Sequence, residues 1–428
     1  MNRRRVVITG IGSVTPMGND VQSTWQGVLD GSSGVARITH FDPSGFPAQI
    51  AGEVKSFDFS TWVKRDPILK HAKANTKFAL VASEEAIKDS GLDWENLDAK
   101  RKGIYFAAGD SEGSVDVLGK AFHKAWQANG SSFDLAAYLE ERAGTGDGVV
   151  ECEKEPAQTL RHMVKHFGAR GPVYNCLTAC AASAQAIGEA VELIRHGDAD
   201  IMLSGGSHSM IHPFGIAGFC LLTTLSVLND TPEQASRPFD ATRSGFVLSE
   251  GAGAVILEEY EHAKKRGATI YAELAGYGTT ADAYRLTDSH PEGIGASAAL
   301  EMAIKDSGVA LTDVDYLNAH GTSTKVNDAV ETIAIKKIFG EHAKDLWVSS
   351  TKSMTGHLIA AAGVVELIIC LLAMRDGVAP PTINYKHKDP DCDLDYIPNQ
   401  SRQKEINVCA SNSFGFGGQN IVLVVKKT

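Results

Sequence analysis

The sequence lacks a hydrophobic run of membrane-spanning length and has no excess of basic residues. Its 428 residues include 41 Lys and Arg against 52 Asp and Glu, which gives a formal net charge of −11. Membrane helices need about 20 consecutive apolar residues, and nucleic-acid surfaces need clustered positive charge. We therefore expect neither a membrane nor a nucleic acid as a partner. The amino-terminal "MNRRRVVITGIGSV" is basic and then apolar, but glycines interrupt it, so it is interpreted as a first strand and not as a leader peptide.

Cysteine is also scarce and unpatterned. The seven cysteines are scattered along the chain, and no CxxC pair occurs. A disulfide framework is not expected, and a reduced, cytoplasmic compartment is the simplest interpretation. Cys176 and Cys180 have no further ligands nearby in the sequence, so no metal site is expected. The segment "GIGSVTPMG" lacks the GxGxxG spacing of a dinucleotide-binding turn, and no other motif for a bound cofactor is present.

The chain does contain a regular alternation of short β-branched runs and helical patterns. Strands are predicted at 6–9, 104–107, 173–177, 201–204, 254–258, 271–278, 316–319, 348–350, 407–411 and 420–425. Helices are predicted at 76–90, 181–196, 295–307, 328–339 and 356–375. Such alternation favours an α/β fold in which helices cover the sheets.

A weak internal echo suggests two halves. "VELIRHGDADIML" from Val191 and "VELIICLLAMRDG" from Val365 each follow a short strand, a small-residue turn and a helix start. Two halves of similar layout would meet near residue 265. The segment 129–155 interrupts the first half, and it is rich in glycine and acidic residues. It is predicted to be an exposed excursion with a short helix at 135–142.

One cysteine stands where a strand pattern turns into a helix pattern, in "NCLTACAASAQAIGEAVELIRHG". Cys180 lies just before the predicted helix, whose unpaired N–H groups and dipole favour a thiolate over a thiol. The same amides could hold an oxyanion if the sulfur attacked a carbonyl. The alternative is a small buried residue that packs in a crowded turn. Position alone does not separate these two interpretations.

Other polar residues lie at strand ends that could serve a nucleophile. "LNAHGTST" carries His320, and "SSTKSMTGHLIAAAG" carries Lys352 and His357, where Gly356 is predicted to start a helix. Each histidine alone is more often structural than catalytic. "SNSFGFGGQN" alternates glycines with Phe414 and Phe416, which indicates irregular backbone close to a ligand or, alternatively, a glycine-rich hairpin.

Taken in order, "TACAAS", "NAHGTST", "TKSMTGH" and "NSFGFGG" resemble the condensing enzymes. The chain is most similar to the β-ketoacyl-acyl carrier protein synthase II type, including the ketosynthases of type II polyketide pathways. The resemblance extends from "VVITGIGSVTPMG" through "SRPFDATRSGFVLSEGAGAVILEE" to the carboxyl end. It implies a thiolase fold, a five-layer αβαβα sandwich made of two similar halves. Residues 1–265 would carry the nucleophile and residues 266–428 the two catalytic histidines.

The resemblance also implies an acyltransferase reaction and a role for each motif. Cys180 would accept an acyl group from the phosphopantetheine of an acyl carrier protein. His320 and His357 would assist decarboxylation of malonyl-acyl carrier protein, and Lys352 with its partner Glu366 would organise the site. Three further assignments concern the substrate. They are an oxyanion hole from the backbone amides of Cys180 and Phe416, a gate at Phe416 beside Phe414, and pantetheine contacts from Thr287, Thr322 and Thr324.

The implied partners are an acyl carrier protein and a second ketosynthase-like chain. Because carrier proteins are acidic, docking needs local positive charge, which Lys64, Arg65 and Lys70 would supply. A homodimer or a heterodimer with a chain-length-factor-like homologue is expected, with no bound cofactor.

Three departures from the family pattern favour a specialised enzyme. Asp110, in "AAGDSEGS", falls where an apolar residue of the acyl pocket is expected, and Arg285 replaces an expected histidine. The 129–155 excursion is also longer than usual. These features favour a type II polyketide ketosynthase over a housekeeping fatty-acid elongation synthase. A non-catalytic chain-length-factor-like subunit is a further alternative, which the presence of Cys180 and both histidines opposes. A thiolase is disfavoured because Cys409 lies outside the position of a second thiolase cysteine.

Overall fold

The computed structural model describes residues 3–108, 115–127, 132–145 and 147–428. Asp110, the predicted acyl-pocket residue, lies outside these ranges. None of the helices found there is both long and apolar enough to span a bilayer.

Ten of the described strands form one sheet that consists of two five-stranded halves. The other four form two small sheets, β2 (Ala36–Arg37) with β3 (Ile50–Ala51) and β11 (Val378–Ala379) with β12 (Arg402–Gln403). The first half runs, in spatial order, β1 (Val6–Val14), β7 (Gly251–Glu259), β6 (Ile201–His208), β4 (Lys102–Ala107) and β5 (Val173–Cys176). The second runs β8 (Ala272–Ala281), β14 (Gln419–Lys426), β13 (Val408–Phe414), β9 (Tyr316–Asn318) and β10 (Trp347–Ser349). If the strands of each half are numbered by their order in the chain, their spatial order is first, fifth, fourth, second and third in both halves. Strand directions also match, with two antiparallel pairs followed by two parallel pairs. Among the described strands, the two half-sheets pair with each other at β1 and β8, where Val7 pairs with Glu273 and Ile8 with Ala272.

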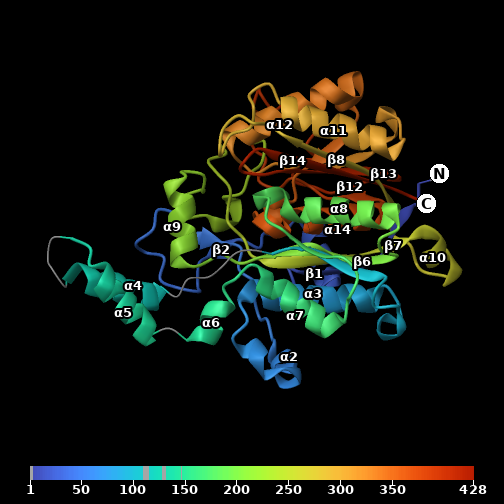
Figure 1. Cartoon of the computed structure of the whole chain (residues 1–428). Coiled ribbons are helices and arrows are strands. Elements are labelled where there is room, and N and C mark those ends of the chain that lie inside the picture. Colours follow the sequence, from blue (N-terminus) through green and yellow to red (C-terminus); the bar gives the residue numbers. More distant parts are fainter. Residues whose placement is uncertain (1–2, 109–114, 128–131, 146) are drawn as a thin grey trace.

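Helices form three layers around the two half-sheets (Figure 1). The outer layers are α3 (Ala74–Asp89) with α7 (Ala157–Phe167), and α11 (Ile294–Ser307) with α12 (Lys325–Phe339). The central layer is α8 (Ala182–His196) with α14 (Ala362–Asp376). Residues 362–374 of α14 are all buried, as expected of a helix that is apolar on every side. This arrangement confirms the predicted α/β class and the five-layer αβαβα sandwich.

Eight shorter or peripheral helices complete the described chain. They are α1 (Val21–Leu29), α2 (Ser60–Arg65), α4 (Val115–Gln127), α5 (Leu135–Thr145), α6 (Gly148–Cys152), α9 (Pro213–Leu221), α10 (Tyr260–Lys265) and α13 (Lys352–Thr355). The helix predicted at 135–142 is present as α5, whereas α4 and α6 were not predicted. Ten predicted strands correspond to β1, β4–β10, β13 and β14.

One predicted helix start is wrong. The helix expected from Gly356 begins instead at Ala362, after a 3-10 turn over Ile359–Ala361. Gly356 ends α13 with a φ of +68°, and a Cβ there would lie 2.0 Å from the Ser249 hydroxyl oxygen. Its backbone conformation and close packing therefore require glycine, and the chain cannot continue as a helix through it.

The two central helices begin in the same way. A 3-10 turn over Ala179–Ala181 precedes α8, as Ile359–Ala361 precedes α14. Both turns open on a non-glycine residue in the left-handed region, with φ +48° at Ala179 and +44° at Ile359. The two halves therefore repeat the same turn before a central helix, but the repeated letters "VELI" do not occupy equivalent positions in the two helices. They fall late in α8 and early in α14.

Candidate active site

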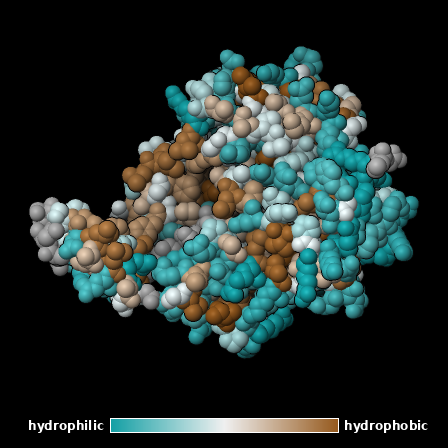
Figure 2. All heavy atoms as spheres, in the orientation of Figure 1, coloured by the Kyte–Doolittle hydropathy of each residue, from teal (hydrophilic) through white to brown (hydrophobic). Residues whose placement is uncertain are grey.

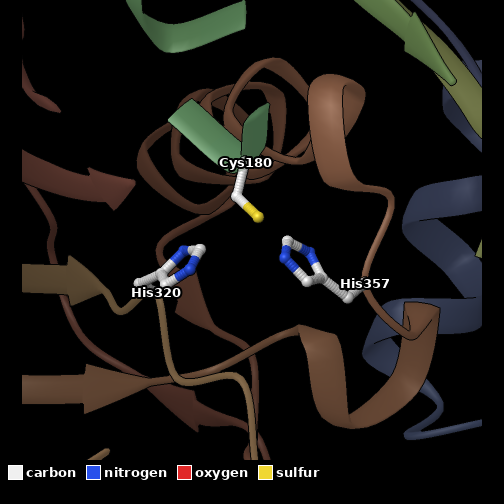
Figure 3. A group of neighbouring side chains, drawn as sticks. All are labelled: Cys180, His320 and His357. Carbon is white, nitrogen blue, oxygen red and sulfur yellow. The ribbon is translucent and has the colours of Figure 1, made fainter. Parts of the chain in front are cut away.

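A cavity of about 470 Å³ opens where the two halves meet in front of the central helices. Its lining includes every predicted catalytic and pantetheine residue except Lys352, namely Cys180, His320, His357, Phe414, Phe416, Thr287, Thr322 and Thr324. The side chains of Cys180, His320 and His357 converge from three separate segments (Figure 3). One ligand-type atom from each lies within 4.8 Å of those of the other two. The sequence therefore predicted residues that the fold brings together.

Cys180 sits in the turn before α8, next to the left-handed Ala179. Its side chain is buried, and burial raises the pKa of the thiol to about 11. The backbone amides of Phe416 and Cys180 and the Lys352 ammonium oppose this rise without overcoming it. These donors favour the thiolate, as the position before a helix predicts, but loss of hydration outweighs them and the pKa of the thiol stays above its usual value.

The two amides that reach the Cys180 sulfur have a second use. The backbone N–H groups of Phe416 and Cys180 lie close enough to the thiol to lower its pKa. A carbonyl carbon bonded to that sulfur would carry its oxygen close to the same donors. The geometry thus has the elements of an oxyanion hole.

Hydrogen bonds select the tautomer of each histidine. The Lys352 ammonium donates to His320 Nδ1 at 3.3 Å, and the Ile359 amide donates to His357 Nδ1 at 3.3 Å. A neutral imidazole that accepts at Nδ1 carries its proton on Nε2. His357 Nε2 is buried without a protein partner among the described atoms. Both rings therefore offer an N–H donor to the cavity.

Burial keeps both imidazoles neutral. Loss of hydration, followed by repulsion from Lys352, holds the pKa of His320 and that of His357 well below the usual value. Lys352 forms a buried ion pair with Glu366, as predicted from the resemblance. Burial raises the pKa of Glu366 to about 7, although the Lys352 ammonium lowers it in part. Lys352 lies behind His320, so it acts on the cavity through that ring.

Glu331 of α12 is a site residue that the sequence did not reveal. Its two carboxylate oxygens accept the backbone N–H groups of His320 at 2.8 Å and Gly321 at 2.7 Å. It also accepts a bond from the Asn412 amide at 2.9 Å, and burial raises its pKa to about 7. The sequence signal is weak, because Glu331 is one of two acidic residues, with Asp328, on the buried face of α12. Glu331 fixes the backbone that carries His320.

The glycine-rich segment after β13 is both a hairpin turn and a wall of the cavity. Gly417 and Gly418, with φ of +90° and +86°, turn the chain between β13 and β14. The Gly417 amide donates to the Leu286 carbonyl at 2.7 Å, which ties this turn to the neighbouring loop. Phe416 packs in the same apolar cluster as Cys180. The segment is therefore both a glycine-rich hairpin and irregular backbone beside the cavity.

Some predicted residues lie elsewhere. Lys64, Arg65 and Lys70 are exposed on α2 and the following 3-10 turn, outside the cavity lining, and Arg65 pairs with Glu84 at 2.7 Å. Arg285 is exposed, pairs with Asp288 at 3.2 Å, and lines a neighbouring hollow that shares Asp288 with the cavity. The Cys409 thiol is buried in β13 and lies 3.8 Å from the Cys370 carbonyl oxygen.

The Cys180, His320 and His357 cluster is close enough to share a metal ion, but its chemistry does not fit one. In the arrangement described, both Nε2 atoms carry protons, and His320 Nδ1 already accepts from Lys352. A dication would also lie near the Lys352 ammonium. The donor set is suited to hydrogen-bond an oxyanion rather than to bind a cation.

These features define a condensing enzyme of the thiolase fold. The chain matches the β-ketoacyl synthase N-terminal domain over residues 3–263 and the C-terminal domain over residues 271–386. The chain belongs to the β-ketoacyl synthase family.

Similar proteins cover the whole chain. It is 44% identical over 427 residues to 3-oxoacyl-[acyl-carrier-protein] synthase 2 of Coxiella burnetii, covering 100% of this chain and 99% of that protein. The protein of the same name from Synechocystis is 42% identical over 431 residues, with 100% and 99% coverage. A ketosynthase solved with its type II polyketide acyl carrier protein is 36% identical, with a TM-score of 0.87 and full coverage of both chains. The ishigamide ketosynthase/chain length factor is 33% identical, with a TM-score of 0.85 and full coverage of both chains.

Proposed function

We propose that this enzyme joins an acyl group held on Cys180 to a malonyl group held on an acyl carrier protein, with loss of carbon dioxide. The observation that carries this proposal is the meeting of one thiol and two neutral imidazole N–H donors in a single cavity. A nucleophile alone would support acyl transfer, whereas the paired donors suit an enolate.

The first step is acyl transfer to Cys180. The sulfur attacks the thioester carbonyl of the acyl carrier, and the oxyanion formed is held by the amides of Cys180 and Phe416. The bond to the pantetheine sulfur then breaks, and that sulfur takes the proton lost by Cys180. The raised pKa of the free thiol makes this coupling of attack and proton transfer necessary.

The second step forms the new carbon–carbon bond. The malonyl carboxyl group leaves as carbon dioxide, and its bonding electrons form an enolate whose oxygen accepts bonds from the Nε2–H groups of His320 and His357. The enolate carbon attacks the acyl carbonyl on Cys180. The bond between that carbonyl and sulfur breaks, and the released Cys180 thiolate takes a proton from water. The product is a 3-oxoacyl carrier protein longer by two carbons. Lys352 and Glu366 hold His320 in the donating tautomer.

The outer cavity receives the substrate arm. Thr322 and Thr324 share a hydroxyl bond of 2.9 Å, and with Thr287 they line the cavity between its mouth and Cys180. We assign them to the pantetheine arm. Phe416, supported by Phe414, gates the space above Cys180 between the two steps.

The carrier protein is the assigned partner. The relative solved with an acyl carrier protein supports this assignment. Lys70 is the assigned docking residue, with Lys64 and Arg65 beside it, and their exposure is compatible with that role. The acyl substrates are carried on this partner's phosphopantetheine, and no other cofactor is required by the steps above.

We divide the chain at residue 265, between α10 and β8, into halves of 1–265 and 266–428. Repetition of the strand order and the two matched domains support this division. We further propose that the enzyme is a dimer. β5 is an edge strand in which Tyr174 is 50% exposed, and Leu177, which follows it, is 58% exposed. Edge strands of this kind invite pairing.

The pathway assigned is a type II polyketide pathway, with fatty-acid elongation as the alternative. Arg285 in the neighbouring hollow and the long excursion support specialisation. Two structural relatives are a type II polyketide ketosynthase and a ketosynthase/chain length factor. The retained Cys180, His320 and His357 oppose a non-catalytic subunit.

Intact-protein mass tests the nucleophile and the pathway together. The enzyme is incubated with saturated acyl carrier proteins of several lengths and with acetyl and polyketide-like donors, beside a Cys180→Ala control. A mass gain equal to the acyl group, absent in the control, is expected. Preference for a long saturated chain would reverse the pathway assignment, and no gain with any donor would overturn the catalytic proposal.

A further inference from the structure

The backbone of His357 is held by the segment that leads into β7, residues 246–249. The His357 amide donates to the Val247 carbonyl at 2.8 Å, and the His357 carbonyl accepts the Ser249 amide at 2.9 Å. The His357 ring meets the Phe246 ring edge-on, with ring centroids 5.2 Å apart. This segment therefore determines the direction in which the buried Nε2–H of His357 points.

A third segment, which follows β3, continues this arrangement on the other side. The Gly52 amide donates to the Leu248 carbonyl at 2.9 Å, and the Gly52 carbonyl accepts the Glu250 amide at 3.0 Å. Gly52 and His357 thus flank the middle segment in a parallel ladder of three segments. The packing is close, because a Cβ at Gly52 would lie 2.2 Å from Ser249 Oγ. A shift of the middle segment is therefore passed on to His357.

The Glu250 side chain joins three parts of the chain beside this ladder. Hydrophilic side chains cover much of the surface in Figure 2, whereas the Glu250 side chain is 1% exposed. Its Oε1 accepts the Val54 amide at 3.0 Å, and its Oε2 accepts the Ser209 hydroxyl at 2.8 Å. Burial raises the pKa of Glu250, and the His40 imidazole, 3.6 Å from Oε1, lowers it in part. A buried carboxyl group destabilises a fold unless it is hydrogen-bonded, so these contacts hold Glu250 and the residues next to it in place.

From these contacts we infer that Glu250 is a positioning residue for His357, because its carboxyl group holds in place the segment to which the His357 backbone is bonded. The inference rests on the proposed function, in which the Nε2–H of His357 stabilises the enolate. Small misplacements of such a donor slow a reaction strongly. Cys180 lies in the turn before α8, and its amide donors are its own and that of Phe416, so acyl transfer to its sulfur should not depend on Glu250.

A second buried glutamate serves the other catalytic histidine directly. Glu331 accepts the His320 amide at 2.8 Å, whereas Glu250 reaches His357 through an intervening segment. We therefore expect loss of the Glu250 carboxyl group to slow malonyl decarboxylation less than loss of the Glu331 carboxyl group does.

Variants of Glu250 separate its hydrogen bonds from its charge. Glu250→Ala removes both acceptor oxygens. Glu250→Gln removes the charge but keeps an oxygen for the Val54 amide and an amide group for the Ser209 hydroxyl. The control is Glu258→Ala, at an equally buried glutamate of β7 that accepts the Thr9 hydroxyl at 2.8 Å.

The two steps are measured on the same purified proteins. Intact mass follows acylation of Cys180, and carbon dioxide release by the acylated enzyme follows decarboxylation of malonyl-acyl carrier protein. Glu250→Ala is expected to acylate at the wild-type rate and to release carbon dioxide about tenfold more slowly, whereas Glu250→Gln should stay close to wild type. Glu258→Ala should leave the ratio of the two rates unchanged. If Glu250→Ala does not fold, Ser209→Ala, which removes one of the two bonds, should show a smaller loss confined to decarboxylation.

Unchanged carbon dioxide release in Glu250→Ala, or an equal loss of both steps, would overturn the inference. So would a Glu250→Gln enzyme as slow as Glu250→Ala, since the role is assigned to the hydrogen bonds and not to the charge. A wild-type enzyme that is acylated but releases no carbon dioxide would instead overturn the proposed function, on which the role of Glu250 depends.

Discussion

At the scale of single residues, the chemistry of Cys180 is a balance between helix-terminal attraction and burial. The position of Cys180 in the sequence indicates the helix-terminal attraction, but it does not indicate how deeply the thiol is buried. The surrounding side chains from both halves, among them Ile359 and Phe416, exclude water from the sulfur. The enzyme therefore stores a neutral thiol and generates sulfur nucleophilicity only when a thioester is bound.

This account predicts how Cys180 responds to pH. With a pKa of about 11, alkylation of Cys180 by iodoacetamide should rise about tenfold per pH unit between pH 7 and 10, because only the thiolate reacts. Peptide mass spectrometry follows the modification, with the exposed Cys152 as an internal reference for the reagent. A rate for Cys180 that levels off below pH 8 would show that the helix terminus prevails over burial.

Glu331 acts on the reaction through His320. Glu331→Ala removes the acceptor for two buried backbone amides, so the His320 ring should no longer be held in position. Because its Nε2–H would then be misplaced, we expect malonyl decarboxylation to fall by about 10²-fold. Acylation of Cys180 should change little. Release of carbon dioxide and intact mass measure the two steps. Glu301→Ala, on the exposed side of α11, is the control. Equal loss of both steps in Glu331→Ala would indicate general unfolding and contradict the positioning role.

At the scale of elements, the strands were predictable because each is a short β-branched run between turn residues. The meeting of Cys180, His320 and His357 could be predicted only by resemblance, since the three lie far apart in the chain. Local pattern failed at Gly356, where a run of small residues suited a helix but the close Ser249 hydroxyl forbids one. It also failed for α4 and for Glu331, whose roles depend on partners that come from other elements.

The turn at Gly356 offers a matched pair of variants. Gly356→Ala adds a Cβ 2.0 Å from Ser249 Oγ at φ +68° and ψ −170°, whereas Gly308→Ala has φ +68° and ψ 13° with no atom within 4 Å, so the two differ in both contact and backbone. Gly308→Ala should cost about 1 kcal/mol of unfolding free energy for the left-handed backbone alone. Gly356→Ala should cost more and should also slow condensation, because His357 follows directly. Urea denaturation measures both, and equal losses would contradict the packing argument.

At the scale of the whole molecule, one strand order is used twice and catalysis uses the two copies differently. Cys180 and Ala360 occupy matching places in the turns before α8 and α14, so only the first half carries a nucleophile. The second half supplies His320, His357 and Lys352. The site exists only where the halves meet, which explains why neither half is expected to act alone.

The central claim is that one cavity both holds the acyl group and activates the malonyl group. The direct measurement charges Cys180 with an acyl group, removes free donor, adds malonyl-acyl carrier protein, and follows both proteins by intact mass. The account predicts that the acyl group leaves Cys180 as a 3-oxoacyl carrier protein appears in equal amount. His320→Ala and His357→Ala should stay acylated. Persistence of acyl-Cys180 beside unchanged malonyl carrier in the wild-type enzyme, or normal transfer in both histidine variants, would contradict it.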